Sequence, residues 1–382
     1  MSGTSLDATD GVLIEWHSPG HISQGALSFT LHARASVPLS AAQREALLQL
    51  NSPGINELHT SSLAANALAL DAASVVHDLL QQTALPAHAI AAVGLPGQTV
   101  RHQPGLYDGY GYTVQLHNAS LLAELCGIDV ITDFRRRDLA AGGQGAPLVP
   151  AFHAALLNGQ TPTAVLNIGG FANLSLLYAP DEINGLDTGP GNVLLDAWCQ
   201  RHQGTAFDPD GQWAASGVVV PELLNHLLQH PYFALPAPKS TGRDDFHIHW
   251  LNQQLAHYAQ HIASSDAHKP PAPADVQATL SDLTAHSIAA ALHNAMPNAE
   301  HLWVCGGGAL NRHLMLRLKE ACHTHGLRIH IQNTLALGLE VMDVEAAAFA
   351  WLALQHLQQQ PGNCPAVTGA SGPRLLGCRY PR

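Results

Sequence analysis

The chain contains 382 residues, which is long enough for two domains with full hydrophobic cores. Its formal net charge of −12 argues against bulk attraction to nucleic acid or to anionic membranes. The 6 cysteines form no C-x-x-C pair, residues 1–20 lack the basic start and apolar core of a signal peptide, and no apolar run approaches the ~20 residues of a membrane span. We therefore expect a cytoplasmic protein with reduced thiols.

Apolar spacing along the chain predicts strands and helices in alternation. Strands are expected at 12–16, 26–34, 90–93, 128–132, 164–168 and 302–305, and helices at 40–51, 56–83, 119–125, 193–200, 274–295, 311–324 and 344–358. This alternation is typical of α/β architecture with mixed sheets. A strand, a turn of small residues and a second strand occur at 1–16 and again at 164–178, which indicates two similar halves that face a cleft.

The chain opens on a turn rich in glycine and hydroxyl side chains, Met1-Ser2-Gly3-Thr4-Ser5-Leu6-Asp7, which leads into an apolar strand. Backbone amides in such a turn can point at phosphate oxygens, and the hydroxyls add donors. Asp7 and Asp10 place carboxylates where a magnesium ion that bridges phosphates would sit. Such a turn normally follows a buried strand, so we expect the true start to lie upstream and Met1 to be an internal methionine.

The best catalytic candidate is Asp187, in the stretch Asp187-Thr188-Gly189-Pro190-Gly191-Asn192. It follows the apolar Leu186, which predicts a strand end, and Val193 begins a predicted helix. A carboxylate held there can act as general base on a hydroxyl or water, and amides at the helix start can bind phosphate. An aspartate that only caps the turn is the alternative.

Two glycine clusters follow predicted strands. At Gly169-Gly170 the backbone can approach a ligand closely, although a plain hairpin explains this pair equally well. Gly306-Gly307-Gly308 lies between a strand and a helix, where a nucleotide base or ribose can lie on the backbone. The cluster lacks G-x-G-x-x-G spacing, which argues against a Rossmann dinucleotide site, and the absence of G-x-x-x-x-G-K-[ST] excludes a P-loop.

Basic residues and histidines add three further candidates. Three arginines at 135–137 are flanked by acids and followed by Gly142-Gly143-Gln144-Gly145, a block that can position a carboxylate or phosphate, with a salt-bridged surface as the alternative. The stretch 238–243 combines a cation with hydroxyls and is interpreted as a polar loop or as a lid over a ligand. The 25 histidines show no ligand set at matched spacing, so we expect no dedicated zinc site.

The order of these blocks identifies a family. The segments concerned are MSGTSLD at 1–7, GQTVRH at 97–102, DFRRRD at 133–138, GGQGAPLVP at 142–150, NIGGF at 167–171, DTGPGN at 187–192, PKSTGR at 238–243, VCGGG at 304–308, NCP at 363–365 and TGA at 368–370. Together they closely resemble the anhydro-N-acetylmuramic acid kinase family over nearly the whole chain.

The resemblance implies a two-domain actin/hexokinase-like (ribonuclease H-like) α/β fold, with mixed sheets flanked by helices. We expect an N-terminal lobe from residues 1–135 and about 355–382, a C-terminal lobe from 136–354, and ATP and the sugar in the cleft between them. The family is typically dimeric, so a homodimer without nucleic-acid or membrane partners is expected.

The resemblance also implies a reaction in peptidoglycan recycling and amino-sugar catabolism. Water opens the 1,6-anhydro ring of anhydro-N-acetylmuramic acid while ATP, accompanied by Mg²⁺, phosphorylates the 6-oxygen, which gives N-acetylmuramic acid 6-phosphate. Asp187 matches the general base of the family, which takes a proton from the water that attacks the anomeric carbon.

Further positions match binding residues of the family. The nucleotide-binding positions are Ser2, Gly3, Thr4, Ser5, Leu6, Asp7, Ala8, Thr9, Gly169, Gly170, Gly306, Gly307, Gly308 and Asn311, and Asp7 is also the candidate for Mg²⁺. The sugar-pocket positions are Gln98, Thr99, Arg137 and Glu345.

The sequence departs from the family at two places. The family has a histidine before Gly-Gln-Thr, where this chain has Pro96, and we expect a polar contact to the substrate to be lost because proline has no N–H donor. An apolar strand precedes the opening turn in the family. The alternatives are therefore another sugar kinase of the same fold, with altered specificity around Pro96, and a catalytically weakened nucleotide-binding protein that lacks its first strand.

Overall fold

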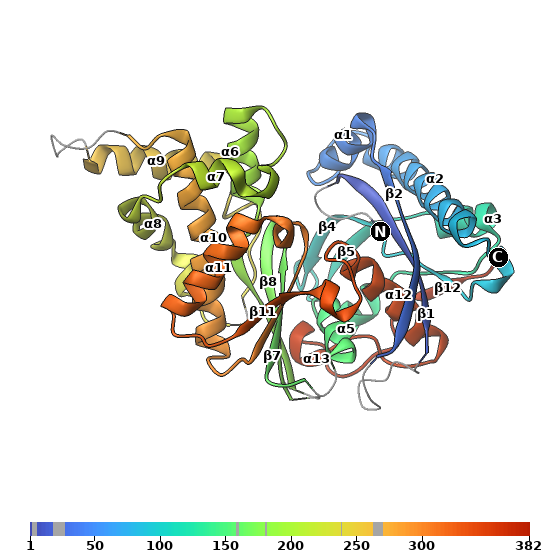
Figure 1. Cartoon of the computed structure of the whole chain (residues 1–382). Helices are drawn as coiled ribbons and strands as arrows, with labels where there is room; N and C mark the ends of the chain where they lie inside the picture. The colour runs from blue at the N-terminus through green and yellow to red at the C-terminus, as the bar shows by residue number, and fades with distance from the viewer. Residues whose placement is uncertain (2–5, 18–26, 158–159, 180–181, 238, 263–269) are drawn as a thin grey trace. The chain divides into compact units, whose positions relative to one another are not determined.

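The computed structural model describes residues 1, 6–17, 27–157, 160–179, 182–237, 239–262 and 270–382. Contacts divide the chain into two compact units, each built from helices and strands (Figure 1). Unit 1 comprises Met1–Gly159, Pro180–Ile183 and Asp343–Arg382, and unit 2 comprises Gln160–Ala179 and Asn184–Met342. The bounds expected at residues 135 and 355 differ from these, because the helices at 136–140, 149–156 and 344–357 belong to unit 1.

The strands of unit 1 form three small sheets. The antiparallel pairs are β1 (Ala8–Trp16) with β2 (Phe29–Pro38) and β4 (Gln98–Pro104) with β5 (Gly111–Leu116). The third sheet has the order β12-β6-β3, from β12 (Cys378–Tyr380), β6 (Val130–Thr132) and β3 (Val93–Gly94), and it is antiparallel between β12 and β6 but parallel between β6 and β3. This combination confirms the prediction of mixed sheets.

The helices of unit 1 cover these strands. They are α1 (Ala41–Gln49), α2 (Glu57–Thr83), η1 (Ala87–Ala89), α3 (Ala119–Cys126), α4 (Arg136–Ala140), α5 (Val149–Leu156), α12 (Val344–Leu357) and α13 (Pro365–Thr368). Local signals explain several of their ends: Ser40 and Gln43 form a reciprocal capping box at α1, and Gly127 ends α3 in the left-handed region. The helix α12 packs against β1, β3 and β6, and α2 packs against β1, β2 and α3.

The longest helix of unit 1, α2, is also largely apolar. By length and composition alone, α2 is apolar enough to cross a membrane, with 44% of its most apolar window buried, and it is the one such helix among the described residues. Its buried side chains from Ala69 to Leu79 lie in the core against α3 and β2. Because the core of a folded unit explains this apolar face, we interpret α2 as a core helix.

Residue Met1 lies beside β1. The amide of Asp10 donates to the carbonyl oxygen of Met1 at 2.7 Å, and the Met1 amino group donates to the carbonyl oxygen of Asp10. This is the pattern of a hydrogen-bonded antiparallel pair. The strands β1 and β3 belong to separate sheets, and α12 contacts both of them.

Unit 2 is built on a mixed five-stranded sheet. Its order is β11-β10-β7-β8-β9, from β11 (His330–Asn333), β10 (His301–Cys305), β7 (Thr163–Ile168), β8 (Phe171–Ala179) and β9 (Glu182–Pro190). The pairs β11–β10 and β10–β7 are parallel, and β7–β8 is an antiparallel hairpin whose strands meet at Ile168 and Ala172. The predicted strands at 164–168 and 302–305 are therefore confirmed.

The helices of unit 2 pack around a single large apolar cluster. They are α6 (Val193–Gln203), η2 (Pro209–Gly211), α7 (Gln212–Ser216), α8 (Pro221–Leu228), η3 (Pro231–Ala234), α9 (Ile248–Ile262), α10 (Pro273–Ala295), η4 (Gly307–Leu310), α11 (Arg312–Thr324) and η5 (Thr334–Leu337). The helix α10 lies against α11, α6, α7, α8 and β8 (Figure 1), which makes it the central helix of this unit.

Candidate functional site

Asp187 lies inside β9, three residues before the strand ends at Pro190. The predicted strand end at Asp187 is therefore wrong, because the ladder continues through the Gly-Pro stretch. Its Oδ2 accepts a hydrogen bond from the Thr241 amide at 3.0 Å, and its own amide donates to the Lys239 carbonyl oxygen at 3.0 Å. Burial raises the pKa of the Asp187 carboxyl, and the Thr241 amide opposes that rise. Asp187 is half-buried, and the Thr241 amide binds one of its two carboxylate oxygens. Such a carboxylate is suited to take up a proton.

The turn after β9 is held by the β7–β8 hairpin. The amides of Gly191 and Val193 donate to the Gly170 carbonyl oxygen at 2.9 and 3.0 Å, and the Asn192 amide donates to the Gly169 carbonyl oxygen at 2.9 Å. These three amides at the start of α6 thus have protein acceptors. The expectation that amides at this helix start bind phosphate is wrong for these three, since a hydrogen bond within the protein already uses each N–H.

Gly169 and Gly170 form the loop of the β7–β8 hairpin, as one of the two interpretations predicted. A Cβ placed on Gly191 would lie 2.4 Å from the Gly169 carbonyl oxygen. The close approach that glycine allows here is therefore made by two segments of the protein itself.

The three glycines at 306–308 approach the same hairpin. Gly306 has a φ of +80°, and a Cβ on it would lie 2.4 Å from Asn167 Oδ1. A Cβ on Gly308 would lie 2.3 Å from Ile168 Cγ2 and 3.2 Å from Asn192 Oδ1. Contact with protein atoms thus requires glycine at 306 and 308, whereas a Cβ on Gly307 would make only ordinary contacts, at 3.9 Å or more. Unit 2 thus places Gly306 and Gly308 against the hairpin that carries Gly169 and Gly170, and Asp187 lies on β9, four residues before the Gly191 that bonds to this hairpin.

Asn311 has a structural role at the start of α11. Its Oδ1 accepts a hydrogen bond from the Leu314 amide at 2.9 Å, which caps the helix. A Cβ on Gly211 would lie 2.3 Å from this same oxygen, so η2 packs tightly on the cap. The predicted nucleoside contact could then use the remaining amide nitrogen of the side chain.

The opening turn belongs to unit 1, where Ser2, Gly3, Thr4 and Ser5 lie outside the described residues. Leu6 is buried, and its carbonyl oxygen accepts a hydrogen bond from Arg44 Nε at 3.1 Å. The Asp7 side chain is exposed and lies 3.9 Å from Arg44 Nη2. Ala8 and Thr9 are the first residues of β1. An exposed carboxylate with one long ion pair remains accessible to a cation.

Gln98 and Thr99 lie at the start of β4. Gln98 is buried, its Nε2 donates to the Thr99 carbonyl oxygen at 3.2 Å, and its Oε1 has no hydrogen-bond partner among the described residues. The Thr99 hydroxyl accepts a hydrogen bond from Gln115 Nε2 at 3.2 Å.

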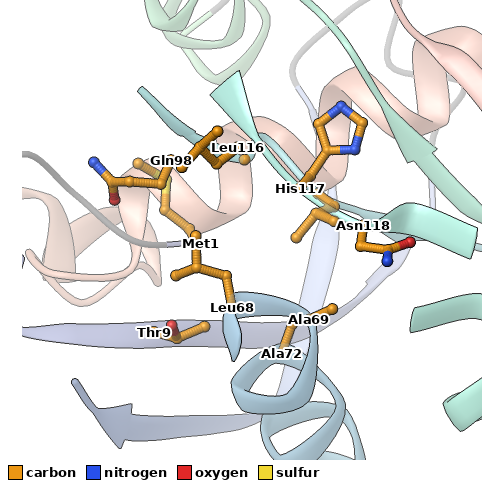
Figure 2. Close-up of a pocket in the computed structure, with 11 residues that line it drawn as sticks. Met1, Thr9, Leu68, Ala69, Ala72, Gln98, Leu116, His117 and Asn118 are labelled. Atoms are coloured by element: carbon orange, nitrogen blue, oxygen red, sulfur yellow. The ribbon is translucent and has the colours of Figure 1, made fainter. Parts of the chain in front are cut away.

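A small cavity adjoins Gln98. Figure 2 shows Met1 among Gln98, Leu68 and Thr9, and the cavity that these residues line measures about 20 Å³. The buried Thr9 hydroxyl also lacks a hydrogen-bond partner among the described residues. A cavity of this size has room for about one water molecule.

Glu345 and the three arginines complete the predicted set. Glu345 lies in the first turn of α12 and is exposed. Loss of hydration from the surrounding protein raises the pKa of its carboxyl, and the positive charge of the nearby Arg135 opposes that rise. Arg135 Nη1 donates to the Gly145 carbonyl oxygen at 2.9 Å, and its guanidinium lies 6.0 Å from the Phe349 ring centroid. Arg137 is exposed on α4. Arg135 is therefore the arginine of this block that acts on Glu345.

Sequence reasoning missed three residues of the site. Arg135 carries no distinguishing local signal within its run of three arginines. Thr241 falls in the 238–243 stretch, where the lid interpretation pointed to a role without naming Asp187 as the partner. The third residue is Tyr232, whose hydroxyl donates to the Asp187 carbonyl oxygen at 2.6 Å. It follows Pro231 at the start of η3, and no motif in the sequence around it indicates a role in the site.

The described residues contain no group of three or more His, Cys, Asp or Glu side chains that could hold a metal ion. A Mg²⁺ that accompanies a nucleotide usually takes one or two carboxylates, with phosphates and waters as its other ligands. The single exposed carboxylate of Asp7 fits that requirement.

Comparison with known proteins adds independent findings. The family model described as anhydro-N-acetylmuramic acid kinase matches residues 1–382. Relatives named anhydro-N-acetylmuramic acid kinase include one from Variovorax paradoxus, 51% identical over 387 residues (100% of this chain, 97% of the relative), and one from Bordetella petrii, 50% identical over 382 residues (100% and 95%).

Two solved structures are more distant. The activator of the 2-hydroxyisocaproyl-CoA dehydratase from Clostridium difficile with bound ADPNP has 11% identity and a TM-score of 0.40, over 92% of this chain and 96% of that one. A ROK family glucokinase from Streptomyces griseus in complex with glucose and AMPPNP has 12% identity and a TM-score of 0.33, over 85% and 94%.

Proposed function

Because the chain belongs to the anhydro-N-acetylmuramic acid kinase family, we propose that it opens the 1,6-anhydro ring of anhydro-N-acetylmuramic acid with water and transfers the γ-phosphoryl group of ATP to the 6-oxygen. The product is N-acetylmuramic acid 6-phosphate. The observation that carries this assignment is the match of the family model to residues 1–382, together with relatives of that name that are 50% and 51% identical over the whole chain. The alternatives of another sugar kinase and of a weakened nucleotide-binding protein have no comparable support.

Asp187 is the general base in this proposal. Its carboxylate takes a proton from the water that attacks the anomeric carbon, and the bond from that carbon to the bridging oxygen breaks. The freed 6-oxygen attacks the γ-phosphorus, and ADP leaves as the bond from the β,γ-bridging oxygen to that phosphorus breaks. Burial raises the pKa of the Asp187 carboxyl, which makes it a stronger base than an exposed aspartate, and the Thr241 amide opposes that rise. The geometry supports one oxygen, Oδ1, as the proton acceptor, since Thr241 holds Oδ2.

The nucleotide is proposed to contact two sets of residues. In unit 1 these are the opening turn and the first residues of β1, at 2–9, and in unit 2 they are the 169–170 hairpin loop, the 306–308 glycines and Asn311. Asp7 would hold Mg²⁺, which neutralises phosphate charge in the transition state of phosphoryl transfer. Support for Asp7 comes from its exposure and from the length, 3.9 Å, of its contact with Arg44.

The sugar is proposed to contact Gln98, Thr99, Arg137 and Glu345 of unit 1. The unpartnered Oε1 of Gln98 offers an acceptor. Glu345 offers an exposed carboxyl on a rigid helix, and Arg135 holds a positive charge near it. Pro96, at the place of the family's histidine, is buried and has no N–H to offer the substrate.

A cytoplasmic homodimer is the proposed form of the enzyme. Large apolar side chains are exposed along α1, α2 and the segment between them, where Ile55 is 99% and Leu58 is 86% exposed. Leu48, Leu63 and Leu70 are exposed on the same two helices. A run of this kind favours burial against a second copy.

The test is a reaction with ATP, Mg²⁺ and anhydro-N-acetylmuramic acid in ¹⁸O-labelled water, followed by mass spectrometry. Label at the anomeric oxygen of the phosphosugar is expected, and product without label would refute water attack. Asp187→Asn should abolish turnover, because an amide cannot take the proton, and should leave ATP affinity in calorimetry within about threefold of wild type.

The matched control is Asp244→Asn, which changes an exposed carboxylate in the loop that carries Thr241. It is expected to retain full turnover. Equal loss of turnover and ATP affinity in Asp187→Asn would assign Asp187 to structure or to the metal instead.

A further inference from the structure

Three hydrogen bonds fix the position of Asp187 within unit 2. Two of them join Asp187 to the segment 239–241: its amide donates to the Lys239 carbonyl oxygen, and its Oδ2 accepts from the Thr241 amide, both at 3.0 Å. The third joins it to η3, because the Tyr232 hydroxyl donates to the Asp187 carbonyl oxygen at 2.6 Å. The main chain and one carboxylate oxygen of this residue are thus held from two directions.

The segment that carries Thr241 is itself anchored. The Thr241 hydroxyl donates to Asp245 Oδ2 at 2.7 Å, and the Asp245 and Phe246 amides donate to the Gly242 carbonyl oxygen at 3.1 Å. Phe246 is fully buried in the core of unit 2. The Thr241 side chain therefore ties the amide that binds Asp187 to a turn with a rigid base.

Lys239 and Tyr232 connect the two supports. Lys239 Nζ donates to the carbonyl oxygens of Tyr232 and Phe233 at 3.2 and 3.3 Å, and it lies 4.6 Å from the centroid of the Tyr232 ring. The Tyr232 ring is buried, and its edge packs against Phe246 with ring centroids 5.7 Å apart. Such packing restricts the hydroxyl to one direction, toward the Asp187 carbonyl oxygen.

We propose that Tyr232 and Thr241 are positioning residues for the general base, Tyr232 through the main chain of Asp187 and Thr241 through its amide on Oδ2. This proposal rests on the role of Asp187 given above. The two supports direct the other carboxylate oxygen, Oδ1, at the attacking water. Small displacements of a reacting group are costly in rate, because the water must be met at hydrogen-bond distance.

The titratable side chains among the contacts described above are those of Tyr232, Lys239 and Asp245. The variants chosen for the test leave all charges unchanged. Tyr232→Phe removes only the hydroxyl that binds the Asp187 carbonyl oxygen, and Thr241→Val removes only the hydroxyl that binds Asp245, while the Thr241 amide stays in the chain.

Each variant has a matched control. Tyr178→Phe removes a hydroxyl that donates to the Ala295 carbonyl oxygen at 2.7 Å, which is the same kind of bond elsewhere in unit 2. Thr241→Ser keeps the hydroxyl that binds Asp245. Circular dichroism and ATP affinity are measured for every variant, and Asp187→Asn is assayed beside them.

Tyr232→Phe is expected to lower kcat about tenfold, with KM for ATP within about twofold, because a misplaced base slows the chemical step and leaves nucleotide binding intact. Thr241→Val is expected to lower kcat similarly and to move the acid limb of kcat/KM to higher pH. The direction follows because the Thr241 amide lowers the pKa of Asp187, and a looser amide lowers it less. Tyr178→Phe and Thr241→Ser should match wild type within about twofold.

The proposal is overturned if Tyr232→Phe and Tyr178→Phe have equal kcat, or if Thr241→Ser is as slow as Thr241→Val. An unshifted acid limb in Thr241→Val also overturns it. If Tyr232→Phe does not fold, the Thr241→Val and Thr241→Ser pair decides the question alone. Turnover by Asp187→Asn would refute the assignment of the base itself, which separates that failure from failure of the positioning role.

Discussion

Replacing Asp138 by alanine removes the centre of a buried hydrogen-bond cluster in unit 1. The Asp138 side chain is fully buried, and the residue lies in the middle of the short helix α4. Its Oδ2 accepts from the Gly145 amide at 2.8 Å, and its Oδ1 accepts from Asn363 Nδ2 at 2.7 Å and from the Thr368 hydroxyl at 2.8 Å. One carboxylate thereby joins α4, the glycine-rich block and the C-terminal segment.

The expected loss of stability follows from the three donors. A buried donor left without an acceptor costs about 1–3 kcal/mol, and partial relaxation brings the sum for Asp138→Ala to about 3–5 kcal/mol. Asp138→Asn keeps an acceptor for Asn363 and Thr368 and turns an NH₂ group toward the Gly145 amide, so it loses one bond and about 1–3 kcal/mol. Asp138→Ala should therefore lose more free energy of unfolding than Asp138→Asn.

The assay is the free energy of unfolding in urea, followed by circular dichroism, together with thermal melting. For a domain of 150–250 residues, 1 kcal/mol shifts Tm by roughly 2–4 °C, so Asp138→Ala should melt about 10 °C below wild type. Asp78→Ala, an exposed carboxylate on α2, is the control and should stay within about 0.5 kcal/mol. A loss below about 1 kcal/mol in Asp138→Ala, or equal losses in both Asp138 variants, would refute the assignment of three bonds to this carboxylate.

Two further predictions concern backbone space and burial. Gly306→Ala should destabilise unit 2 by more than about 1 kcal/mol and weaken ATP binding, because its Cβ would lie 2.4 Å from Asn167 Oδ1 at a φ of +80°. The control is Gly204→Ala, which has a φ of +73° and open space around it and therefore adds only the strain of a positive φ. Urea unfolding measures the stability of both variants, and calorimetry measures their ATP affinity. Burial lowers the pKa of His153 from 6.5 to about 3, so the folded state binds fewer protons than the unfolded state between these values and stability falls as pH drops below 6.5. At pH 5 this loss should be about 2 kcal/mol relative to pH 7, and unfolding of His153→Gln at both pH values should lack that part; an unchanged difference would contradict the neutral, buried histidine.

Much of the fold is predictable from the sequence because its signals are local. Apolar spacing marks α2, α10 and α12, and short apolar runs before glycine mark β7 and β10. The glycine clusters and Asp187 stand out because glycine and proline restrict the backbone within a few residues. The β4–β5 hairpin escaped prediction, since its strands carry polar and aromatic residues without a clear period of two.

The sequence by itself determined the α/β class, the family blocks and the identity of the candidate base. Only the tertiary structure decided what surrounds that base: Tyr232 and Thr241 lie 45 and 54 residues away along the chain. The Asp138 cluster joins residues 225 and 230 positions apart. The sequence predicts free amides at the start of α6, whereas in the structure the amides of Gly191, Asn192 and Val193 donate to the Gly169 and Gly170 carbonyl oxygens. Residue spacing records the conformation of a segment, whereas hydrogen bonds between distant segments depend on how the whole chain packs.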